Sequence, residues 1–279
     1  MLFREIAQSL FRRARTPEVP AIQSSEHLVM RRGAQAIFSP NYPKSHLDPS
    51  VVSAIIDTVR PLTMVHETGV EFVIHETVRL IESDIPGLFV ECGVWRGGCS
   101  LASLLAQRAA FGEVSRPIYL LDSFEGLPLV TEKDGPLAAA WQKGEVSETF
   151  LDNCRATEDE VGGALKRHGF GPNDAITVKG WFKDTLPGVV DALKGDGIAL
   201  LRLDADWYDS TIECLTALEP LVSEEATVII DDYYAWDGCA RAVHDYFSRH
   251  SLPYRIKSLP YNFGMFFTKR SHRSSYEQF

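Results

Sequence analysis

Short apolar runs alternate with amphipathic stretches along most of the chain, and this alternation limits the possible folds more than any other feature. Buried strands are predicted at 88–93, 117–123, 175–180, 197–206, 226–232, 254–259 and 262–270. Apolar residues have helical spacing at 50–60, 67–82, 100–109, 158–168, 186–193, 210–222 and 238–249. Strands that alternate with helices in this way form parallel βαβ units, whose helices cover both faces of one sheet. With right-handed crossovers, the sequence predicts an α/β fold with an open, doubly wound sheet.

The two last apolar runs, 254–259 and 262–270, follow each other without a helix between them. This pattern is typical of a hairpin, so we expect a mostly parallel sheet with an antiparallel terminal strand. The length of 279 residues suits one large α/β domain or two small ones. We predict one domain at 50–270, preceded by an arm or lid at 1–49 and followed by a tail at 271–279.

The composition disfavours several classes of protein. The formal net charge of −10 at pH 7 argues against nucleic acids and anionic membranes as partners, because both bind basic surfaces. No apolar run approaches the roughly 20 residues that a membrane-spanning helix needs. The 5 cysteines have no CxxC spacing, which disfavours a disulfide framework or a zinc site and fits a cytoplasmic protein.

A glycine-rich turn follows the first predicted strand, in the order Glu91-Cys92-Gly93-Val94-Trp95-Arg96-Gly97-Gly98-Cys99-Ser100. Ligands of open α/β sheets bind beyond the carboxyl ends of the strands, and a helix N-terminus there attracts a carboxylate. Glu91 could accept a hydrogen bond from an ammonium group, so a ligand with an amino-acid end would satisfy both features. The glycine spacing differs from that of dinucleotide folds and P-loops. The alternative is a tight strand-to-helix turn that binds no ligand.

Asp122 ends the second predicted strand, within the segment LLDSFEGLP (120–128). An acidic side chain at the end of the second strand of such a sheet is well placed to bind ribose hydroxyls. The alternative is a helix N-cap, a role that the neighbouring Ser123 could share.

Four aspartates are predicted at the ends of two further strands. Asp204 and Asp206 end the fourth strand, and Asp231 and Asp232 end the fifth. Sequential parallel strands are usually neighbours, so we expect the four carboxylates to lie close together. Crowded like charges raise one another's pKa unless a cation is present, and hard oxygen ligands suit Mg²⁺.

Arg202 is a rival partner for these carboxylates. In a strand, side chains alternate between the two faces, so Arg202 points to the same side as Asp204. In the alternative without a metal, Asp204 and Asp209 cap a helix, and Asp231 and Asp232 form a solvated turn.

At these residues the chain resembles the macrocin O-methyltransferase family, whose members methylate sugar hydroxyls in antibiotic biosynthesis. The matching segments are VECGVWRGGCS (90–100), LLDSFEGLP (120–128), VKGWFKDTLP (178–187), LLRLDADWYDST (200–211) and IIDDYYAWDGCARAV (229–243). The resemblance implies the class I methyltransferase fold, a Rossmann-like sheet that binds S-adenosylmethionine (SAM) and has an antiparallel seventh strand.

The resemblance also implies roles for individual residues. Asp204, Asp231 and Asp232 would bind Mg²⁺, and Asp206 would be the general base that deprotonates the acceptor hydroxyl. The residues expected to bind SAM are Thr63, Met64, Glu91, Gly93, Val94, Ser100, Asp122, Ser123, Gly180 and Trp181.

Residues 1–45 and 131–172 depart from the family pattern, and they would cover the acceptor. The resemblance favours a small molecule as the acceptor, namely a sugar hydroxyl of a glycosylated natural product. Three alternatives stay open: a catechol-like or other vicinal-diol acceptor, a non-catalytic SAM-binding homologue, and a nicotinamide dehydrogenase. An exposed apolar face on 67–82 would fit a homodimer or higher homo-oligomer.

Overall fold

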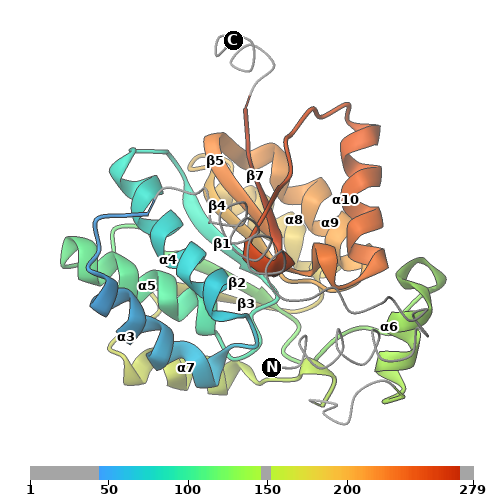
Figure 1. Cartoon of the computed structure of the whole chain (residues 1–279), viewed down its shortest axis with the longest axis horizontal. Coiled ribbons are helices and arrows are strands. Elements are labelled where there is room, and N and C mark those ends of the chain that lie inside the picture. Colours follow the sequence, from blue (N-terminus) through green and yellow to red (C-terminus); the bar gives the residue numbers. More distant parts are fainter. Residues whose placement is uncertain (1–43, 146–151, 271–279) are drawn as a thin grey trace, which may run out of the picture.

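The computed structural model describes residues 44–145 and 152–270, which form a seven-stranded sheet between two layers of helices (Figure 1). The strand order is β3-β2-β1-β4-β5-β7-β6. The strands are β1 (Leu88–Cys92), β2 (Ile118–Asp122), β3 (Ala175–Lys179), β4 (Ile198–Leu203), β5 (Val222–Ile230), β6 (Lys257–Ser258) and β7 (Met265–Thr268). Strands β1 to β5 pair in parallel, whereas β7 is antiparallel to both β5 and β6. The predicted α/β sheet with an antiparallel terminal strand is therefore confirmed.

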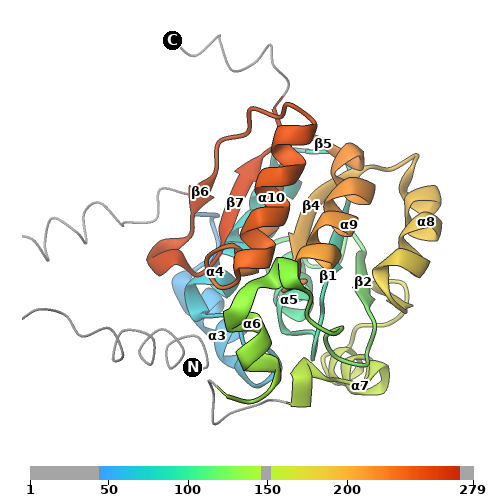
Figure 2. The same cartoon turned by 90° about the vertical axis from the view of Figure 1, so that its right-hand side faces the viewer.

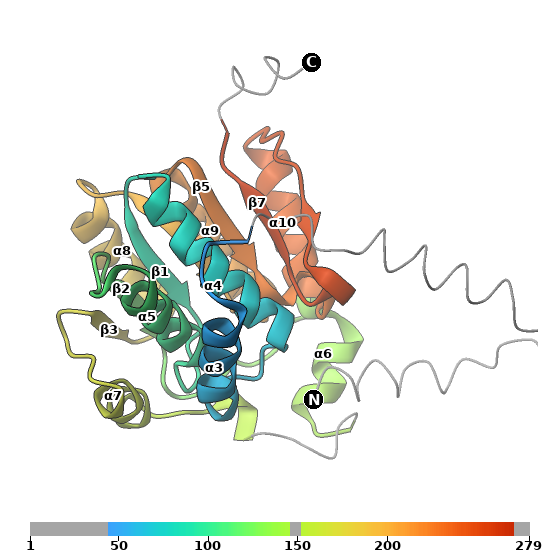
Figure 3. The ribbon, with the colours of Figure 1, turned by 60° about the vertical axis from the view of Figure 1, so that its left-hand side comes forward.

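Helices cover both faces of the sheet, as the alternating pattern predicted (Figure 3). On one face lie α3 (Pro49–Val59), α4 (Glu67–Glu82), α5 (Gly98–Phe111) and α7 (Glu158–Arg167). On the other face lie α8 (Phe182–Leu193), α9 (Tyr208–Leu218) and α10 (Asp237–Arg249). Each layer buries its apolar side chains against the sheet in its own core cluster.

Local sequence explains where two of these helices begin. The side chain of Asp48 accepts a hydrogen bond from Ser50 N, and Pro49 occupies the first turn of α3. Thr157 and Glu160 form a reciprocal capping box at the start of α7.

Several element boundaries differ from the sequence prediction. β4 ends at Leu203, because the chain turns away at Asp206, whose φ of 53° is left-handed. β5 begins earlier than expected, at Val222, and of the strand predicted at 254–259 only the two residues of β6 form. α8 also begins earlier than expected, at Phe182.

The polar segment after β2 contains a helix that periodicity did not predict, α6 (Gly135–Gln142), which lies near the start of α10 (Figure 2). Ala138 and Trp141 of α6 are buried. The preceding short helix η2 (Glu132–Asp134) ends in a buried Asp134, whose carboxylate accepts a 2.7 Å hydrogen bond from Tyr208 N at the start of α9. These contacts pack the segment on the carboxyl ends of the strands.

Part of the predicted organisation lies outside the described residues, namely most of the arm at 1–49, residues 146–151 of the polar segment, and the tail at 271–279. The described end of the arm already contributes Leu47 to the core. Among the helices of the described ranges, none has the length and apolar character needed to cross a bilayer.

Candidate active site

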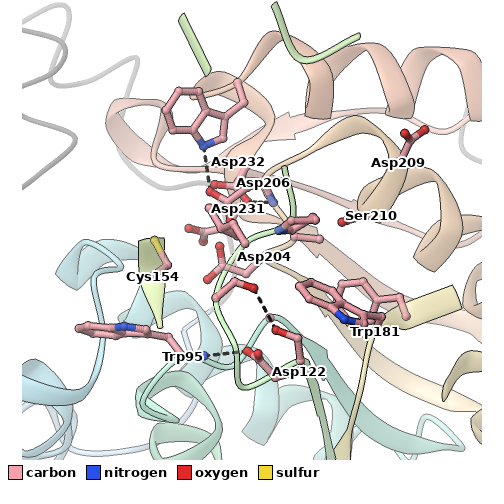
Figure 4. Close-up of a pocket in the computed structure, with 18 of the residues that line it drawn as sticks. Trp95, Asp122, Cys154, Trp181, Asp204, Asp206, Asp209, Ser210, Asp231 and Asp232 are labelled. Atoms are coloured by element: carbon pink, nitrogen blue, oxygen red, sulfur yellow. Dashed lines mark hydrogen bonds between the residues drawn. The ribbon is translucent and has the colours of Figure 1, made fainter. Parts of the chain in front are cut away.

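A cavity of about 320 Å³ opens at the carboxyl ends of the parallel strands. The turns that follow β1, β2, β3, β4 and β5 all contribute to its lining. In Figure 4, Trp95 and Trp181 lie on either side of Asp122, and the labelled aspartates of the β4 and β5 ends are grouped beyond them. This is the edge at which open α/β sheets bind ligands.

The ends of β1 and β4 are in close contact at Gly93. Gly93 has a φ of 83°, and a Cβ atom at this position would lie 1.7 Å from the carbonyl oxygen of Asp204. The Asp204 N–H donates a 2.8 Å hydrogen bond to Cys92 O, and the Gly93 N–H donates one of 2.9 Å to Leu121 O. Only glycine fits there, and it brings the glycine-rich loop directly against the first aspartate of the acidic group.

Asp122 organises the glycine-rich loop. Its Oδ2 accepts hydrogen bonds from the backbone N–H groups of Val94 (2.7 Å) and Trp95 (3.1 Å), and its Oδ1 accepts one from Phe124 N (2.7 Å). Burial raises the pKa of Asp122, and the three backbone donors oppose that rise. A carboxylate offers about four acceptor positions, so one remains for a ligand hydroxyl.

The residues expected to bind the cosubstrate divide into two groups. Those that line the cavity are Met64, Gly93, Asp122, Ser123, Gly180 and Trp181. Those that lie outside its lining are Thr63, Glu91, Val94 and Ser100. Of the second group, Val94 uses its backbone to bind Asp122, and the Ser100 hydroxyl donates to Glu91. These hydrogen bonds stabilise the glycine-rich loop and are not part of the cavity lining.

Glu91 is buried and paired inside the protein, and it does not belong to the cavity lining. Arg202 Nη1 donates a 2.8 Å hydrogen bond to Glu91 Oε1, and both side chains are 5% exposed. Burial raises the pKa of Glu91, whereas the Arg202 charge and the Ser100 hydroxyl lower it. The carboxylate that we expected to face an ammonium group is thus engaged by a guanidinium.

Arg202 also reaches the acidic group, as its strand position predicted. Its Nη2 lies 3.0 Å from Asp204 Oδ2 and 3.0 Å from Asp231 Oδ1. One buried guanidinium therefore contacts carboxylates from the ends of β1, β4 and β5. Its positive charge neutralises part of theirs.

The four predicted aspartates meet, but their side chains have different partners. Carboxylate oxygens of Asp204, Asp206 and Asp232 lie within 4.8 Å of one another. The Asp206 N–H donates a 3.0 Å hydrogen bond to Asp232 Oδ2. Asp231 lines the same cavity, with Oδ1 on Arg202. The parallel pairing of β4 with β5, in which Leu203 is opposite Ile230, brings these strand ends together.

Burial and crowding disfavour ionisation of this group. Burial raises the pKa of Asp206 well above its ordinary value, and the charge of Asp204 raises it further. Burial and the Asp206 charge do the same for Asp232. Burial raises the pKa of Asp231 to about 7, although the Arg202 charge opposes the rise. A cation among these oxygens would favour their ionised forms.

The donor set fits a hard divalent cation. Mg²⁺ binds oxygen at about 2.0–2.1 Å, so two of its ligands are at most about 4.2 Å apart. One carboxylate oxygen from each of Asp204, Asp206 and Asp232 lies within 4.8 Å of the other two, which is close to that spacing. All three residues line the cavity, so an ion there would also reach a bound ligand.

Sequence analysis assigned no role to several aromatic residues around the cavity. Trp95, Trp141 and Trp236 line it, as does Cys154. The sequence could have indicated a place near the cavity for three tryptophans. Trp95, Trp207 and Trp236 each follow the end of a parallel strand within a few residues. The sequence gave no such indication for Trp141, because it belongs to α6, the helix that periodicity did not predict.

Three of these tryptophans pack together beside the acidic group, and we call them the indole cluster: Trp141, Trp207 and Trp236. Their ring centres are 5.1–6.0 Å apart in edge-to-face pairs. Trp207 Nε1 donates a 3.0 Å hydrogen bond to Pro128 O, and Trp236 Nε1 donates one of 3.0 Å to Asp206 Oδ1.

Comparison with known proteins finds relatives that are named as methyltransferases. Residues 56–269 match the family described as Macrocin-O-methyltransferase (TylF). One relative is the 8-demethyl-8-(2,3-dimethoxy-alpha-L-rhamnosyl)-tetracenomycin-C 4'-O-methyltransferase of Streptomyces olivaceus, 38% identical over 180 residues. Another is the mycinamicin III 3''-O-methyltransferase of Micromonospora griseorubida, 34% identical over 174 residues. The aligned segments cover 63% and 62% of this chain, and 63% and 65% of these relatives.

Solved structures give the same fold. The O-methyltransferase NovP superimposes with a TM-score of 0.68 and 25% identity, over 80% of this chain and 100% of NovP. The calicheamicin methyltransferase CalS11 superimposes with a TM-score of 0.58 and 18% identity, over 91% of this chain and 99% of CalS11. The second likeness shows the fold alone.

Proposed function

The chain belongs to the macrocin O-methyltransferase family, and on this premise we propose that it is a SAM-dependent O-methyltransferase of a glycosylated natural product. One observation carries the proposal: a single cavity joins the glycine-rich loop and Asp122 to the oxygens of Asp204, Asp206 and Asp232. Methyl transfer to a hydroxyl requires a cosubstrate site and a proton acceptor that share one space.

We assign the cosubstrate to the loop between β1 and α5. Helix α5 begins at Gly98 without a side-chain cap, so its first N–H groups can attract the carboxylate of SAM. The acceptor position left on Asp122 suits a ribose hydroxyl. Gly180 and Trp181, after β3, line the cavity where the adenine is expected.

We assign Mg²⁺ to Asp204, Asp231 and Asp232. A bound Mg²⁺ would supply Lewis-acid polarisation, which lowers the pKa of an acceptor hydroxyl. Asp204 and Asp232 belong to the 4.8 Å group of oxygens. Asp231 lines the cavity beside them and has a second carboxylate oxygen besides the one on Arg202.

We assign the general base to Asp206. Its carboxylate lines the cavity, and its backbone N–H is held by Asp232. Asp206 takes the proton of the acceptor hydroxyl while the hydroxyl oxygen bonds to the methyl carbon of SAM. The bond from that carbon to sulfur breaks at the same time. S-adenosylhomocysteine leaves as a neutral thioether, so no protein acid is needed.

We assign a sugar hydroxyl as the acceptor, which makes the reaction a tailoring step in antibiotic biosynthesis. The names of the relatives describe methylation of a rhamnosyl tetracenomycin and of mycinamicin III. In this chain Pro128, Trp141 and Trp236 line the cavity on the side of the aspartates. Apolar atoms of such side chains can contact the C–H groups of a sugar ring.

Mass spectrometry of an acceptor panel tests the proposal. The purified protein is incubated with methyl-labelled SAM, MgCl₂ and one acceptor at a time: the rhamnosyl tetracenomycin, mycinamicin III, or catechol as a sugar-free diol. We expect labelled methyl on a glycosylated acceptor, with S-adenosylhomocysteine formed in equal amount. Methylation of catechol alone would contradict the sugar acceptor. Failure to bind SAM in calorimetry would contradict the whole proposal.

A further inference from the structure

Arg202 places a buried positive charge against the acidic group. Its Nη2 lies 3.0 Å from Asp204 Oδ2 and 3.0 Å from Asp231 Oδ1. The Arg202 side chain is only 5% exposed and does not belong to the cavity lining, whereas Asp204 and Asp231 both line the cavity. Each of these two carboxylates therefore contacts the guanidinium and also borders the space in which a cation would bind.

Glu91 fixes the position of this charge. Arg202 Nη1 donates a 2.8 Å hydrogen bond to Glu91 Oε1, and the Ser100 hydroxyl donates to the other oxygen, Oε2. Glu91 and Ser100 are both buried. The guanidinium cannot move away from the acidic group without breaking a buried ion pair, which is costly.

A fixed positive charge in this position has two opposite effects. Without a cation, it attracts carboxylates that would otherwise repel one another, so it favours their close approach. When a cation binds, two positive charges share the same carboxylates and repel each other, and water screens this repulsion little at a buried site. Arg202 should therefore stabilise the empty acidic group and weaken the binding of a cation to it.

We propose that Arg202 is a built-in counter-charge that holds the acidic group together without a cation and lowers the affinity of the group for one. This inference rests on the proposed function, because it takes the acidic group as the cation site. It requires no division of the four aspartates into ligands and base. Since Arg202 does not line the cavity, it acts through Asp204 and Asp231, as a positioning residue.

Manganese binding tests this role on the full chain, without SAM or an acceptor. Mn²⁺ titration followed by electron paramagnetic resonance is compared for the wild-type protein, Arg202→Met, which removes the charge, and Arg202→Lys, which keeps it. We expect the Kd for Mn²⁺ to be roughly tenfold or more lower in Arg202→Met, because a repelling charge is lost. In Arg202→Lys the Kd should stay within about threefold of the wild-type value, because an ammonium group still supplies a positive charge.

A Kd in Arg202→Met equal to or above that of the wild-type protein would overturn the inference and leave the proposed function standing. Equal decreases in Arg202→Met and Arg202→Lys would also overturn it, because the charge would then not be the cause. Absence of Mn²⁺ binding by the wild-type protein would instead contradict the proposed metal site, and the inference with it. These failures are therefore distinguishable.

The double variant Glu91→Gln/Arg202→Met decides the question if Arg202→Met does not fold. It removes both charges of the buried pair, so no unpaired carboxylate remains at position 91. Its reference is Glu91→Gln alone, in which Arg202 keeps Asp204 and Asp231 as partners. We expect the Kd for Mn²⁺ to be roughly tenfold or more lower in the double variant than in Glu91→Gln. An equal or higher Kd would overturn the inference.

Heat denaturation of the same two variants gives an independent readout. The increase in Tm from EDTA to one fixed excess of MgCl₂ should be larger in the double variant than in Glu91→Gln, because tighter binding to the folded state stabilises it more. Equal increases in Tm would contradict the proposed effect of Arg202 on cation affinity.

Discussion

Arg202 and Glu91 form a buried ion pair beneath the cavity, with Arg202 Nη1 2.8 Å from Glu91 Oε1. The pair joins the end of β4 to the end of β1, and Arg202 continues to Asp204 and Asp231 through Nη2. The glycine-rich loop and the acidic group are thus connected through one guanidinium. The stability of the site should depend on it.

We expect Arg202→Met to lower the free energy of unfolding by about 3–5 kcal/mol, because it leaves buried carboxylates without their counter-charge. Urea denaturation followed by circular dichroism measures the change. Lys194→Met is the matched control, since Lys194 forms an exposed pair with Asp191 and should cost less than about 1 kcal/mol. Similar losses in the two variants would show that the buried pair contributes little.

We expect Asp122→Ala to weaken SAM binding roughly 10- to 100-fold. The variant removes the acceptor for three backbone N–H groups, including those of Val94 and Trp95 in the glycine-rich loop, and each lost bond costs about 1–3 kcal/mol when its donor stays buried. Isothermal titration calorimetry gives the affinity. Asp191→Ala, at an exposed site on α8, serves as the control. Unchanged SAM affinity in Asp122→Ala would contradict the role of Asp122 in the loop.

The sheet, and the position of Gly93 and Asp122 at one cavity, could be predicted from the sequence because they depend on local patterns. Alternation of strands and helices determined the layers, and Gly93 and Asp122 stand at strand ends where such sheets bind ligands. The partners of Glu91 could not be predicted in this way. The Arg202 guanidinium reaches it from another strand, which only the register of β1 against β4 reveals.

Tertiary packing also explains why helix α6 could not be predicted from the sequence. Helix α6 lies in a polar segment, and it is held mainly by Trp141 in the indole cluster and by hydrogen bonds from Gln142. Neither contact has a local sequence signal. The length of β4 was overestimated for a related reason, since the left-handed turn at Asp206 depends on its contacts with Asp232 and Trp236.

Gln142 provides a test of whether the polar segment helps to bind the proposed acceptor. Its Oε1 accepts from Val130 N, and its Nε2 donates to Pro128 O and Asn153 Oδ1, so it ties together both sides of the polar segment. We expect Gln142→Ala to raise the KM for the acceptor several-fold while the Kd for SAM stays unchanged. Steady-state kinetics and calorimetry measure the two constants. A parallel loss of SAM affinity would show that the segment supports the cosubstrate site instead.

Removal of divalent metal should greatly slow turnover while SAM binding is kept. Lewis-acid polarisation contributes several kcal/mol, so EDTA should slow methyl transfer roughly 100-fold or more, and excess Mg²⁺ should restore it. The Kd for SAM, measured by calorimetry in EDTA, should stay within about twofold, because its proposed contacts avoid the acidic group. Full activity after exhaustive chelation would remove the metal from the mechanism.

The most direct test is single-turnover methyl transfer by Asp206→Asn, with SAM and an acceptor that the wild-type protein methylates. Removal of a general base should lower the rate about 10²- to 10⁴-fold, with SAM affinity unchanged by calorimetry. A rate equal to that of the wild-type protein would contradict the assignment of Asp206, and with it the chemistry proposed for the acidic end of the cavity.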